Sequence, residues 1–350
     1  MPSRPVATSH PSDLPLLRVV QAQDADEHAA NLSQWDQLYD QLTPGNFEGS
    51  VTELWLPQSQ IFVETANQTL RQSCAAWDDS IWFGIPAPGQ GLMSWGGREL
   101  PPNAVCVREG GAEFELRTAP NFNLFGIVVE REAFGTYLES THQRSLDDLL
   151  AVRDVMTLPL ALKADVCSKL SAILTDADSC LPYATAADGV NLQGRIFASL
   201  VRLLSASDDA HAHASRRDYR QAYRHPALDR LRNDILEQPG THFSVDDLCE
   251  RFHLSRRALQ NYFEEATGLA PLAYMRALRL NAARRALKQG ESAGTVSEVA
   301  YTWGFNHLGK FAQQYHAMFG ELPSQTRHNI SHHRSGRARY LPQMSDYFSD

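Results

Sequence analysis

The sequence lacks the features that mark secreted, membrane-spanning and zinc-binding proteins. Its five cysteines are odd in number and scattered, without a Cys-x-x-Cys pair, which argues against a disulfide framework or a zinc site. No stretch approaches the roughly 18 apolar residues of a membrane helix. The N-terminal residues have no apolar signal-peptide core. We therefore expect a cytoplasmic protein with no membrane partner.

Histidine is also absent from residues 45–129, the most strand-like part of the chain. The main rival from another functional class is an enzyme with a metal-binding barrel fused to a DNA-binding domain. Its metal site would need two or three histidines and a carboxylate on neighbouring strands. The sequence has no P-loop, GxSxG or HExxH motif either. We therefore expect no enzyme activity, no catalytic residue, no metal and no required cofactor.

The charge balance differs between the two parts of the chain. The net charge is −9, yet residues 1–223 carry 16 basic and 28 acidic side chains, a net of −12, whereas residues 224–340 carry 16 basic and 11 acidic ones, a net of +5. A basic segment is what neutralisation of DNA phosphates requires. The C-terminal part is therefore the candidate nucleic-acid binder.

Short strand-like runs dominate residues 51–129. They are rich in β-branched and aromatic residues, and Gly, Pro, Asn or Asp separates them at regular intervals. Regular short strands favour a barrel or a sandwich, and we expect a cupin-like β-barrel. The expected strands are Val51–Leu56, Gln60–Thr65, Leu70–Cys74, Ser80–Ile85, Gly91–Trp95, Ala104–Arg108, Glu113–Arg117 and Phe122–Val129.

Helical periodicity takes over from about residue 130, most clearly in 161–178 and 190–205, and a short helix is also predicted at Leu32–Leu42. The predicted fold class is a two-domain α+β protein with a β-barrel sensor and an all-α C-terminal domain. The expected divisions are a disordered 1–30, a β-rich effector-sensing and dimerisation domain at 31–205, a linker at 206–224, a DNA-binding domain at 225–328 and a mobile tail at 329–350.

Two helix-turn-helix patterns lie in tandem within the basic segment, at Ser244–Phe263 and Thr295–Phe311. In each, a short helix with apolar residues at positions i, i+3, i+4 and i+7 is followed by a tight turn. A second helix then begins at a capping residue, Ser255 in the first unit and Asn306 or His307 in the second. One such pattern is a weak signal, but two in tandem indicate a protein that binds duplex DNA.

The second helix of each unit is the predicted recognition helix, with one face buried and the other free for base edges. The predicted inner residues are Leu259, Tyr262 and Phe263, then Phe305, Phe311 and Tyr315. The predicted DNA-binding residues are Arg256, Arg257, Gln260 and Asn261 in the first unit and His307, Gly309, Lys310 and Gln313 in the second. Arginine suits guanine, whereas Gln and Asn suit adenine. Alternatively, Arg256 and Arg257 are solvated or contact phosphates.

A continuous helical pattern at Pro271–Lys288 separates the two units, with proline in its first turn. A stiff helix there would place the two recognition helices in successive major grooves, about 34 Å apart on one face of the DNA. Its arginines are expected mostly on a solvated face or in pairs within the domain, with a minority on phosphates: Arg276, Arg279, Arg284 and Arg285.

Residues 240–327 resemble the DNA-binding domain of the AraC/XylS family of transcription regulators. The resemblance is carried by Ser255-Arg-Arg-Ala-Leu259, Tyr262-Phe263, Gly268, Val299-Ala300, Gly304-Phe305, Phe311, Phe319-Gly320, Pro323 and Arg327. The sequence departs from the family pattern in the second recognition helix, where Gln313 and His316 stand in place of the usual Arg and Lys. The resemblance implies double-stranded promoter DNA and RNA polymerase as partners.

The N-terminal part looks like the ethanolamine-operon regulator branch of this family. The similar segments are Trp35–Gly49, Leu70–Cys74, Trp82–Pro86, Gly110–Arg117 and Trp303–Gly309. This resemblance implies an activator of ethanolamine catabolic genes, with ethanolamine and adenosylcobalamin as effectors. The Asp-x-His-x-x-Gly signature that supplies a cobalt-binding histidine is missing, since Asp209-Ala-His211 is not followed by the required glycine.

A small ammonium ligand needs an aromatic face and a nearby carboxylate. The candidate ligand-binding residues are Trp82, Phe83, Trp95 and Glu113. Trp82 and Phe83 are adjacent on an expected strand, so they point to opposite faces and only one can line a pocket. The common alternative is that these aromatic residues simply fill the core.

Two further alternatives remain open. A ligand-independent architectural DNA protein would leave the acidic β-rich domain without a role. A regulator of the same build that senses a different small amine or nitrogenous metabolite is the closer rival. In either regulator, effector binding is expected to change how the β domain packs on residues 130–205 or on the DNA-binding domain, and helices in 130–205 are expected to form a homodimer.

Overall fold

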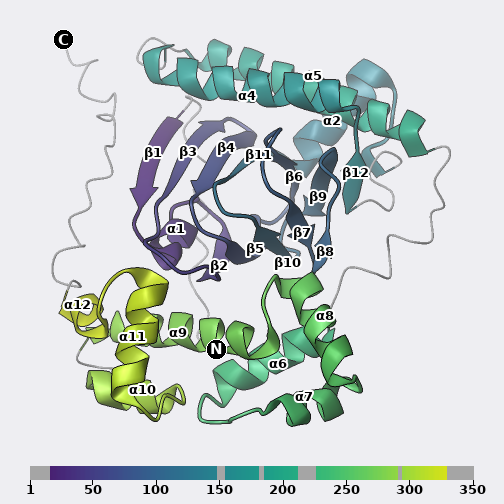
Figure 1. The fold of residues 1–350 in the computed structure, drawn as a ribbon. Helices are drawn as coiled ribbons and strands as arrows, with labels where there is room; N and C mark the ends of the chain where they lie inside the picture. The colour runs from purple at the N-terminus through teal and green to yellow at the C-terminus, as the bar shows by residue number, and fades with distance from the viewer. Residues whose placement is uncertain (1–15, 148–153, 181–184, 212–225, 291–293, 329–350) are drawn as a thin grey trace, which may run out of the picture.

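A computed structural model describes residues 16–147, 154–180, 185–211, 226–290 and 294–328, and Figure 1 shows how they are arranged. The strands form two sheets in which all neighbouring strands are antiparallel. The larger sheet runs β1 (Leu16–Ala22), β3 (Gly49–Leu56), β4 (Ser59–Ala66), β11 (Phe122–Glu130), β6 (Ser80–Pro86), β9 (Ala104–Glu109) and β12 (Val155–Thr157). The smaller runs β2 (Asp36–Gln41), β5 (Leu70–Ala75), β10 (Phe114–Thr118), β7 (Met93–Trp95) and β8 (Arg98–Glu99).

Aromatic side chains fill the space between the two sheets. The ring of Trp82 in β6 stacks on Phe114 in β10, with centroids 4.5 Å apart and planes inclined by 14°. Gly84 and Gly126 are paired across β6 and β11, and a Cβ atom at either position would collide with the ring of Trp82 or Phe62. Stacked, buried rings stabilise the packing beyond their area alone. Glycine on this face therefore makes the room that the large rings need.

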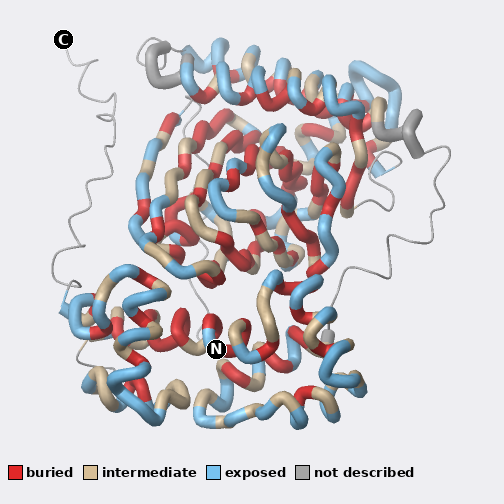
Figure 2. Tube along the Cα trace, viewed as in Figure 1, coloured by how far each residue is buried: buried red, intermediate tan, exposed pale blue. Residues whose placement is uncertain are grey.

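Three helices cover the outer face of the larger sheet, as Figure 1 shows: α2 (Arg131–His142), α4 (Leu160–Cys180) and α5 (Ala186–His211). Their buried sides, red in Figure 2, form a second core with strands of the larger sheet. Phe83, Phe134 and Phe197 belong to this core. The predicted helices at 161–178 and 190–205 are therefore confirmed by α4 and α5. A short helix, α1 (Ala25–Ala30), packs near β1 and β2.

The C-terminal part is built around one long helix, α9 (Pro271–Leu287), as the predicted connecting helix requires. One end of α9 packs with α6 (Pro226–Glu237), α7 (Val245–Phe252) and α8 (Arg256–Thr267), and the other end packs with α10 (Val296–Thr302) and α11 (Leu308–Phe319). The last helix of this domain is α12 (Pro323–His328). Two small hydrophobic cores thus share a single rigid helix. We name the two parts after their expected roles: residues 226–328 are called the DNA-binding domain and residues 16–211 the sensor domain.

Each of the eight expected strands overlaps a strand of the structure, but the expected cupin-like β-barrel does not close. The two sheets keep separate edges, with β1 and β12 at the edges of one and β2 and β8 at the edges of the other. Alternating apolar residues predict strands with one face buried, and that pattern is the same in a sandwich and a barrel. The sequence pattern therefore did not decide closure.

The N-terminal region also differs from expectation. Leu32–Leu42 was predicted to be a helix, but β2 occupies Asp36–Gln41. Residues 16–30, expected to be disordered, form β1 and α1. The expected linker at 206–224 begins inside α5, which ends at His211, and its remainder lies outside the described residues, as does the expected tail at 329–350.

The free edge of β2 is covered by side chains of α9 rather than by another strand. Asn281 accepts a hydrogen bond of 3.0 Å from the Gln41 amide and donates one of 2.9 Å to the Gln41 carbonyl. Arg285 donates to the carbonyl of Tyr39 at 2.7 Å. Unpaired backbone groups at a buried edge are costly. Asn281 and Arg285 therefore join the two domains by completing the hydrogen bonding of β2.

Asp40 is the charged centre of the same contact. Its buried carboxylate lies 2.5 Å from Nη2 of Arg285, 3.6 Å from Nη1 of Arg71 and 4.0 Å from Nε of Arg232. Burial opposes ionisation, but the three guanidinium groups outweigh it and hold the pKa of Asp40 below its ordinary value. One carboxylate of the sensor domain thus lies within ion-pair distance of two arginines of the DNA-binding domain.

The sensor domain also contacts the C-terminal ends of both α8 and α11. At α11, the Gly45 amide donates to the carbonyl oxygens of Ala317 and Met318, both at 3.1 Å, and Gln41 donates to Met318 at 2.7 Å. At α8, a Cβ atom on Gly268 would lie 2.9 Å from the guanidinium of Arg117. Both helices are therefore held against the sensor domain by the ends that carry exposed carbonyl groups.

Replacing Asp40 with asparagine should lower the free energy of unfolding by about 3–5 kcal/mol, because the buried Arg71 and the partly buried Arg232 and Arg285 lose their shared counter-charge. Urea denaturation monitored by tryptophan fluorescence measures this. Since the pKa of Asp40 is lowered in the folded chain, its contribution is present above about pH 4 and is lost as the pH falls through the folded value. D40N should therefore lose less stability on acidification than the wild type.

Asp165→Asn is the matched control, because Asp165 makes an exposed pair with Lys169 at 2.6 Å. This control should unfold close to the wild-type midpoint. If D40N and D165N unfold alike, Asp40 does not hold the domains together.

Candidate nucleic-acid interface

The first helix-turn-helix unit is formed by α7 and α8. Ser244 caps α7 in a capping box with Asp247, each side chain accepting from the other's backbone amide. The turn is made at His253, whose φ of 54° lies in the left-handed region. Ser255 then caps α8 by accepting from the Ala258 amide at 3.3 Å. The predicted cap at Ser255 is confirmed.

The second unit, formed by α10 and α11, repeats this construction with one difference. Thr295 and Glu298 form the capping box of α10. His307 is the N-cap of α11, one of the two predicted positions, but its side chain makes no capping hydrogen bond. The left-handed residue that ends α11 is Gly320. The start of α11 therefore relies on backbone geometry alone.

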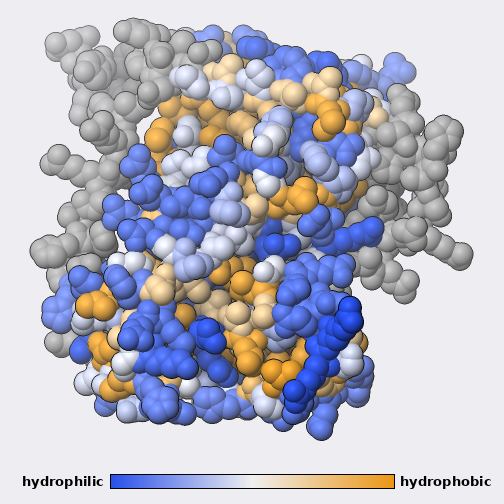
Figure 3. All heavy atoms as spheres, viewed as in Figure 1, coloured by the Kyte–Doolittle hydropathy of each residue, from blue (hydrophilic) through white to orange (hydrophobic). Residues whose placement is uncertain are grey.

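The inner and outer faces of both recognition helices are as predicted. Leu259, Phe263, Phe311 and Tyr315 are buried, and Tyr262 and Phe305 are half-buried. The outer residues Arg256, Arg257, Asn261, His307, Gly309, Lys310 and Gln313 are exposed, and Gln260 is half-buried. In Figure 3, strongly hydrophilic side chains form a strip at the lower right, over the region of α7 and α8.

The four outer residues of α8 differ in how free they are. Arg256 pairs with Asp246 of α7 through Nε at 3.1 Å and Nη2 at 2.8 Å. Gln260 donates to Glu264 at 2.5 Å. Arg257 makes no hydrogen bond or ion pair with any residue in the described ranges. Because its guanidinium has no partner to give up, Arg257 is better placed than Arg256 or Gln260 to contact a base.

A groove of about 350 Å³ lies between the two units, next to α9. Its lining includes Arg276, Arg279 and Lys310 but no Asp or Glu. Arg279 is partly buried and donates to the carbonyl of Thr241 at 2.5 Å, and burial lowers its pKa. A groove whose charged lining residues are all basic attracts phosphates. The expectation for the α9 arginines was incomplete, however: Arg284 pairs with Glu321 inside the domain, but Arg285 pairs with the sensor domain.

The four predicted ligand-binding residues fall into two groups. Trp82 and Phe83 are 1% and 0% exposed and lie in different cores, so the expected opposite orientation of the two side chains is confirmed. Trp95 and Glu113 both line a cavity of about 500 Å³ between the sensor domain and the DNA-binding domain. We call this the interdomain cavity. The structure thus brings Trp95 and Glu113 together and leaves Trp82 and Phe83 enclosed.

The residues that join the domains were missed by sequence reasoning. Asp40 and Gln41 lie in a segment that was predicted to be helical, and Asn281 was not singled out. One signal was present: α9 carries Asn281 and Arg285 four residues apart, on one helix face. A polar pair on one face of a helix can indicate a second packing surface.

Comparison with known proteins supports the assignment of the C-terminal domain. Residues 248–329 match the helix-turn-helix domain family. The chain is 37% identical over 102 residues to the XylDLEGF operon transcriptional activator 2 of Pseudomonas putida, which covers 29% of this chain and 65% of that protein. It is 27% identical over 204 residues to the HTH-type transcriptional activator RhaR of Pectobacterium atrosepticum. That match covers 54% of this chain and 70% of RhaR.

Among solved structures, a probable AraC family transcriptional regulator from Rhodopseudomonas palustris is 30% identical and covers 30% of this chain and 97% of that chain, with a TM-score of 0.28. The match thus spans less than two thirds of the length of the Pseudomonas putida activator 2. It spans 32% of the length of two other activators of the same operon. The matched family region contains both recognition helices.

Arg257→Ala should weaken binding to a cognate duplex, selected by the full chain from a random pool, by about 1–3 kcal/mol. Its effect on a scrambled duplex should be smaller, because base contacts distinguish sequences. Fluorescence anisotropy at fixed salt measures both affinities. Arg202→Ala, which removes an equal charge from the exposed face of α5, is the control. An equal loss on both duplexes would make Arg257 a phosphate contact.

Proposed function

We propose that this chain, whose C-terminal helix-turn-helix domain belongs to the AraC/XylS family, is a sequence-specific transcription regulator that binds promoter DNA. The observation that carries the proposal is the pair of exposed recognition faces, on α8 and α11, fixed to one helix, α9. Two recognition helices on a rigid connection suit two consecutive major grooves of one duplex. Both relatives are transcriptional activators by name, which favours activation over repression.

The groove between the units supplies the sequence-independent part of the contact. Phosphates that lie between two neighbouring major grooves would face Arg276, Arg279 and Lys310. Contacts of this kind orient a protein on DNA, whereas base contacts specify the sequence. We therefore assign base contacts to Arg257 and Gln260, with Arg256, Asn261, His307, Gly309 and Gln313 as further DNA contacts. Lys310 serves both the groove and the outer face of α11.

For the effector we propose ethanolamine, with adenosylcobalamin as a second effector, on the resemblance of the sensor domain to the ethanolamine-operon branch. The interdomain cavity supports an ammonium ligand in one respect, since its lining includes the aromatic ring of Trp95 and the carboxylate of Glu113. The alternative is a different small amine or nitrogenous metabolite. A homodimer through the outer helices and contact with RNA polymerase complete the proposal; Leu160 and Val190, both exposed on α4 and α5, favour that dimer face.

In vitro transcription tests the function directly. A template carries the selected duplex upstream of a core promoter, and the full chain is added with ethanolamine, with adenosylcobalamin or with both. We expect transcript to rise several-fold in the presence of chain and effector, because the effector favours the activating conformation. A template with a scrambled duplex is the control. No dependence on the duplex would contradict the regulator function.

Thermal denaturation of the same protein tests separately whether ethanolamine is the effector. A ligand at about 100 times its dissociation constant stabilises the folded state by about 2.7 kcal/mol, so ethanolamine should raise the melting temperature. If ethanolamine and adenosylcobalamin leave it unchanged while another small amine raises it, the alternative effector is correct.

A further inference from the structure

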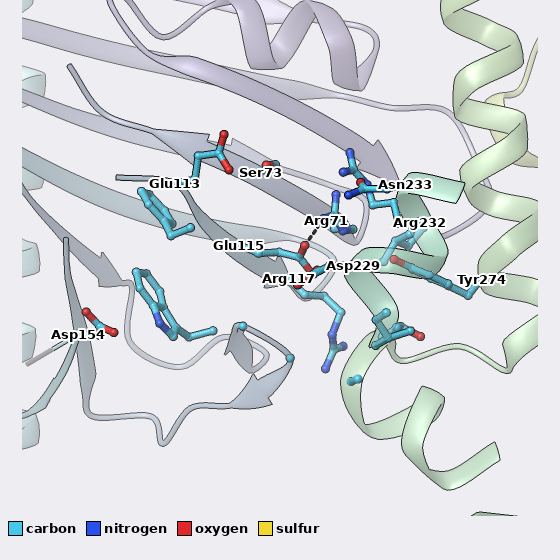
Figure 4. Close-up of a pocket in the computed structure, with 18 of the residues that line it drawn as sticks. Arg71, Ser73, Glu113, Glu115, Arg117, Asp154, Asp229, Arg232, Asn233 and Tyr274 are labelled. Carbon is cyan, nitrogen blue, oxygen red and sulfur yellow. Dashed lines mark hydrogen bonds and ion pairs between the residues drawn. The ribbon is translucent and has the colours of Figure 1, made fainter. Parts of the chain in front are cut away.

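The interdomain cavity has an arginine-rich end that ethanolamine does not explain. Figure 4 shows Arg71 of β5 beside Arg232 of α6, and Arg117 of β10 extending between the strands and the helices of the DNA-binding domain. Tyr274 of α9 completes this end. The cavity volume, about 500 Å³, lies in the range of small-molecule sites. Side chains of both domains thus converge on one space large enough for a metabolite.

Four carboxylates also line the cavity, those of Glu113, Glu115, Asp154 and Asp229. The carboxylates within ion-pair distance of Arg71, Arg117 and Arg232 only partly neutralise these arginines. Arg71 pairs closely with Glu115 and lies 3.6 Å from Asp40, but Asp40 is engaged most closely by Arg285, at 2.5 Å. Nε of Arg232 lies 4.0 Å from the carboxylate of Asp40. Burial lowers the pKa of Arg232, and the like charge of Arg71 lowers it further. Arg117 has no ion-pair partner in the described part of the chain, and burial lowers its pKa as well.

The same guanidinium groups also have unsatisfied donors. Nε and Nη1 of Arg71, Nε of Arg117 and Nε of Arg232 are buried, and no atom of the residues that the structure describes accepts a hydrogen bond from them. Arg71 is only 5% exposed. Buried donors of a charged group without acceptors are costly, and native proteins place them where something else accepts. The donors are fork-shaped and cationic, which suits the oxygens of a carboxylate or phosphate.

We propose that the interdomain cavity binds a small oxyanion, a carboxylate or phosphate group of a metabolite, between Arg71 and Arg117 of the sensor domain and Arg232 of the DNA-binding domain. The body of the molecule lies toward Trp95 and Phe114, which line the cavity. This site goes beyond the proposed regulator function, because its occupancy is defined without reference to DNA.

Binding there links the two domains. Arg232 lies on α6, which packs on α9, and Arg117 lies next to Gly268 at the end of the first recognition helix. An anion that draws the three guanidinium groups together therefore acts on the placement of α8 and α9 relative to the sensor domain. A ligand of this kind favours whichever domain arrangement brings the arginines closest.

The full chain is tested by thermal denaturation in sodium phosphate and in sodium succinate, against sodium chloride of equal ionic strength. We expect at least one of the two oxyanions to raise the melting temperature by roughly 2 °C or more. Arg117→Met should abolish that rise. It should also raise the melting temperature in chloride, because it removes a partly buried charge that forms no ion pair with any residue in the described ranges.

Arg131→Met is the matched control, since Arg131 is on the surface, pairs with Glu109 and Asp147 and lies outside the cavity lining. It should keep the oxyanion response. A rise with phosphate alone identifies a phosphoryl ligand, and a rise with succinate alone a carboxylate; both support the site. No rise with either salt, or an equal rise in R117M, overturns it. Binding of the wild type to the selected duplex in chloride is measured in parallel. If the chain binds DNA but shows no response to either oxyanion, the proposed oxyanion site is wrong and the proposed function stands.

Discussion

The structure depends on the way in which α9 completes the free edge of β2. A strand at a sheet edge has unpaired amide and carbonyl groups, and here Asn281 and Arg285 take the place of a neighbouring strand. The same helix supplies part of the hydrophobic core of each helix-turn-helix unit. Because one helix packs in three directions, a change in its position moves both recognition helices. The sensor domain can therefore change the positions of the two recognition helices through α9, without contacting their exposed faces.

Electrostatics reinforces this connection and also limits it. Asp40 is shared among arginines of both domains, which fixes how the two domains fit together. Where the contact opens into the interdomain cavity, however, the positive charge of the arginines exceeds the negative charge of their partners. A buried charge with an incomplete set of partners is sensitive to any ligand that adds one. Communication between effector and DNA requires a ligand that interacts differently with two arrangements of the domains. The cavity is placed where such a difference would arise, because its walls come from both domains.

Local features of the sequence predicted most of the secondary structure and the buried and exposed faces of α8 and α11. Capping residues such as Ser255 and the apolar spacing around Leu259 act within a few residues, so they can be recognised without the fold. The helix predicted at Leu32–Leu42 failed because Trp35 and Leu38 lie three residues apart, as on a helix face. The environment of β2 comes instead from β5 and from α9, whose Asn281 lies 240 residues further along the chain. The same distance hid the pairing of Arg285 with Asp26 and Asp40. Neither the open edges of the two sheets nor the cavity between the domains leaves a periodic signal.

The central claim is that α9 presents two recognition helices to one face of a duplex. Hydroxyl-radical footprinting of the full chain on its selected duplex, at low ionic strength, tests it most directly. The account predicts two protected segments with centres one helical turn apart, about 10 base pairs, on the same face of the DNA. Protection of a single segment, or of two segments on opposite faces, would contradict it.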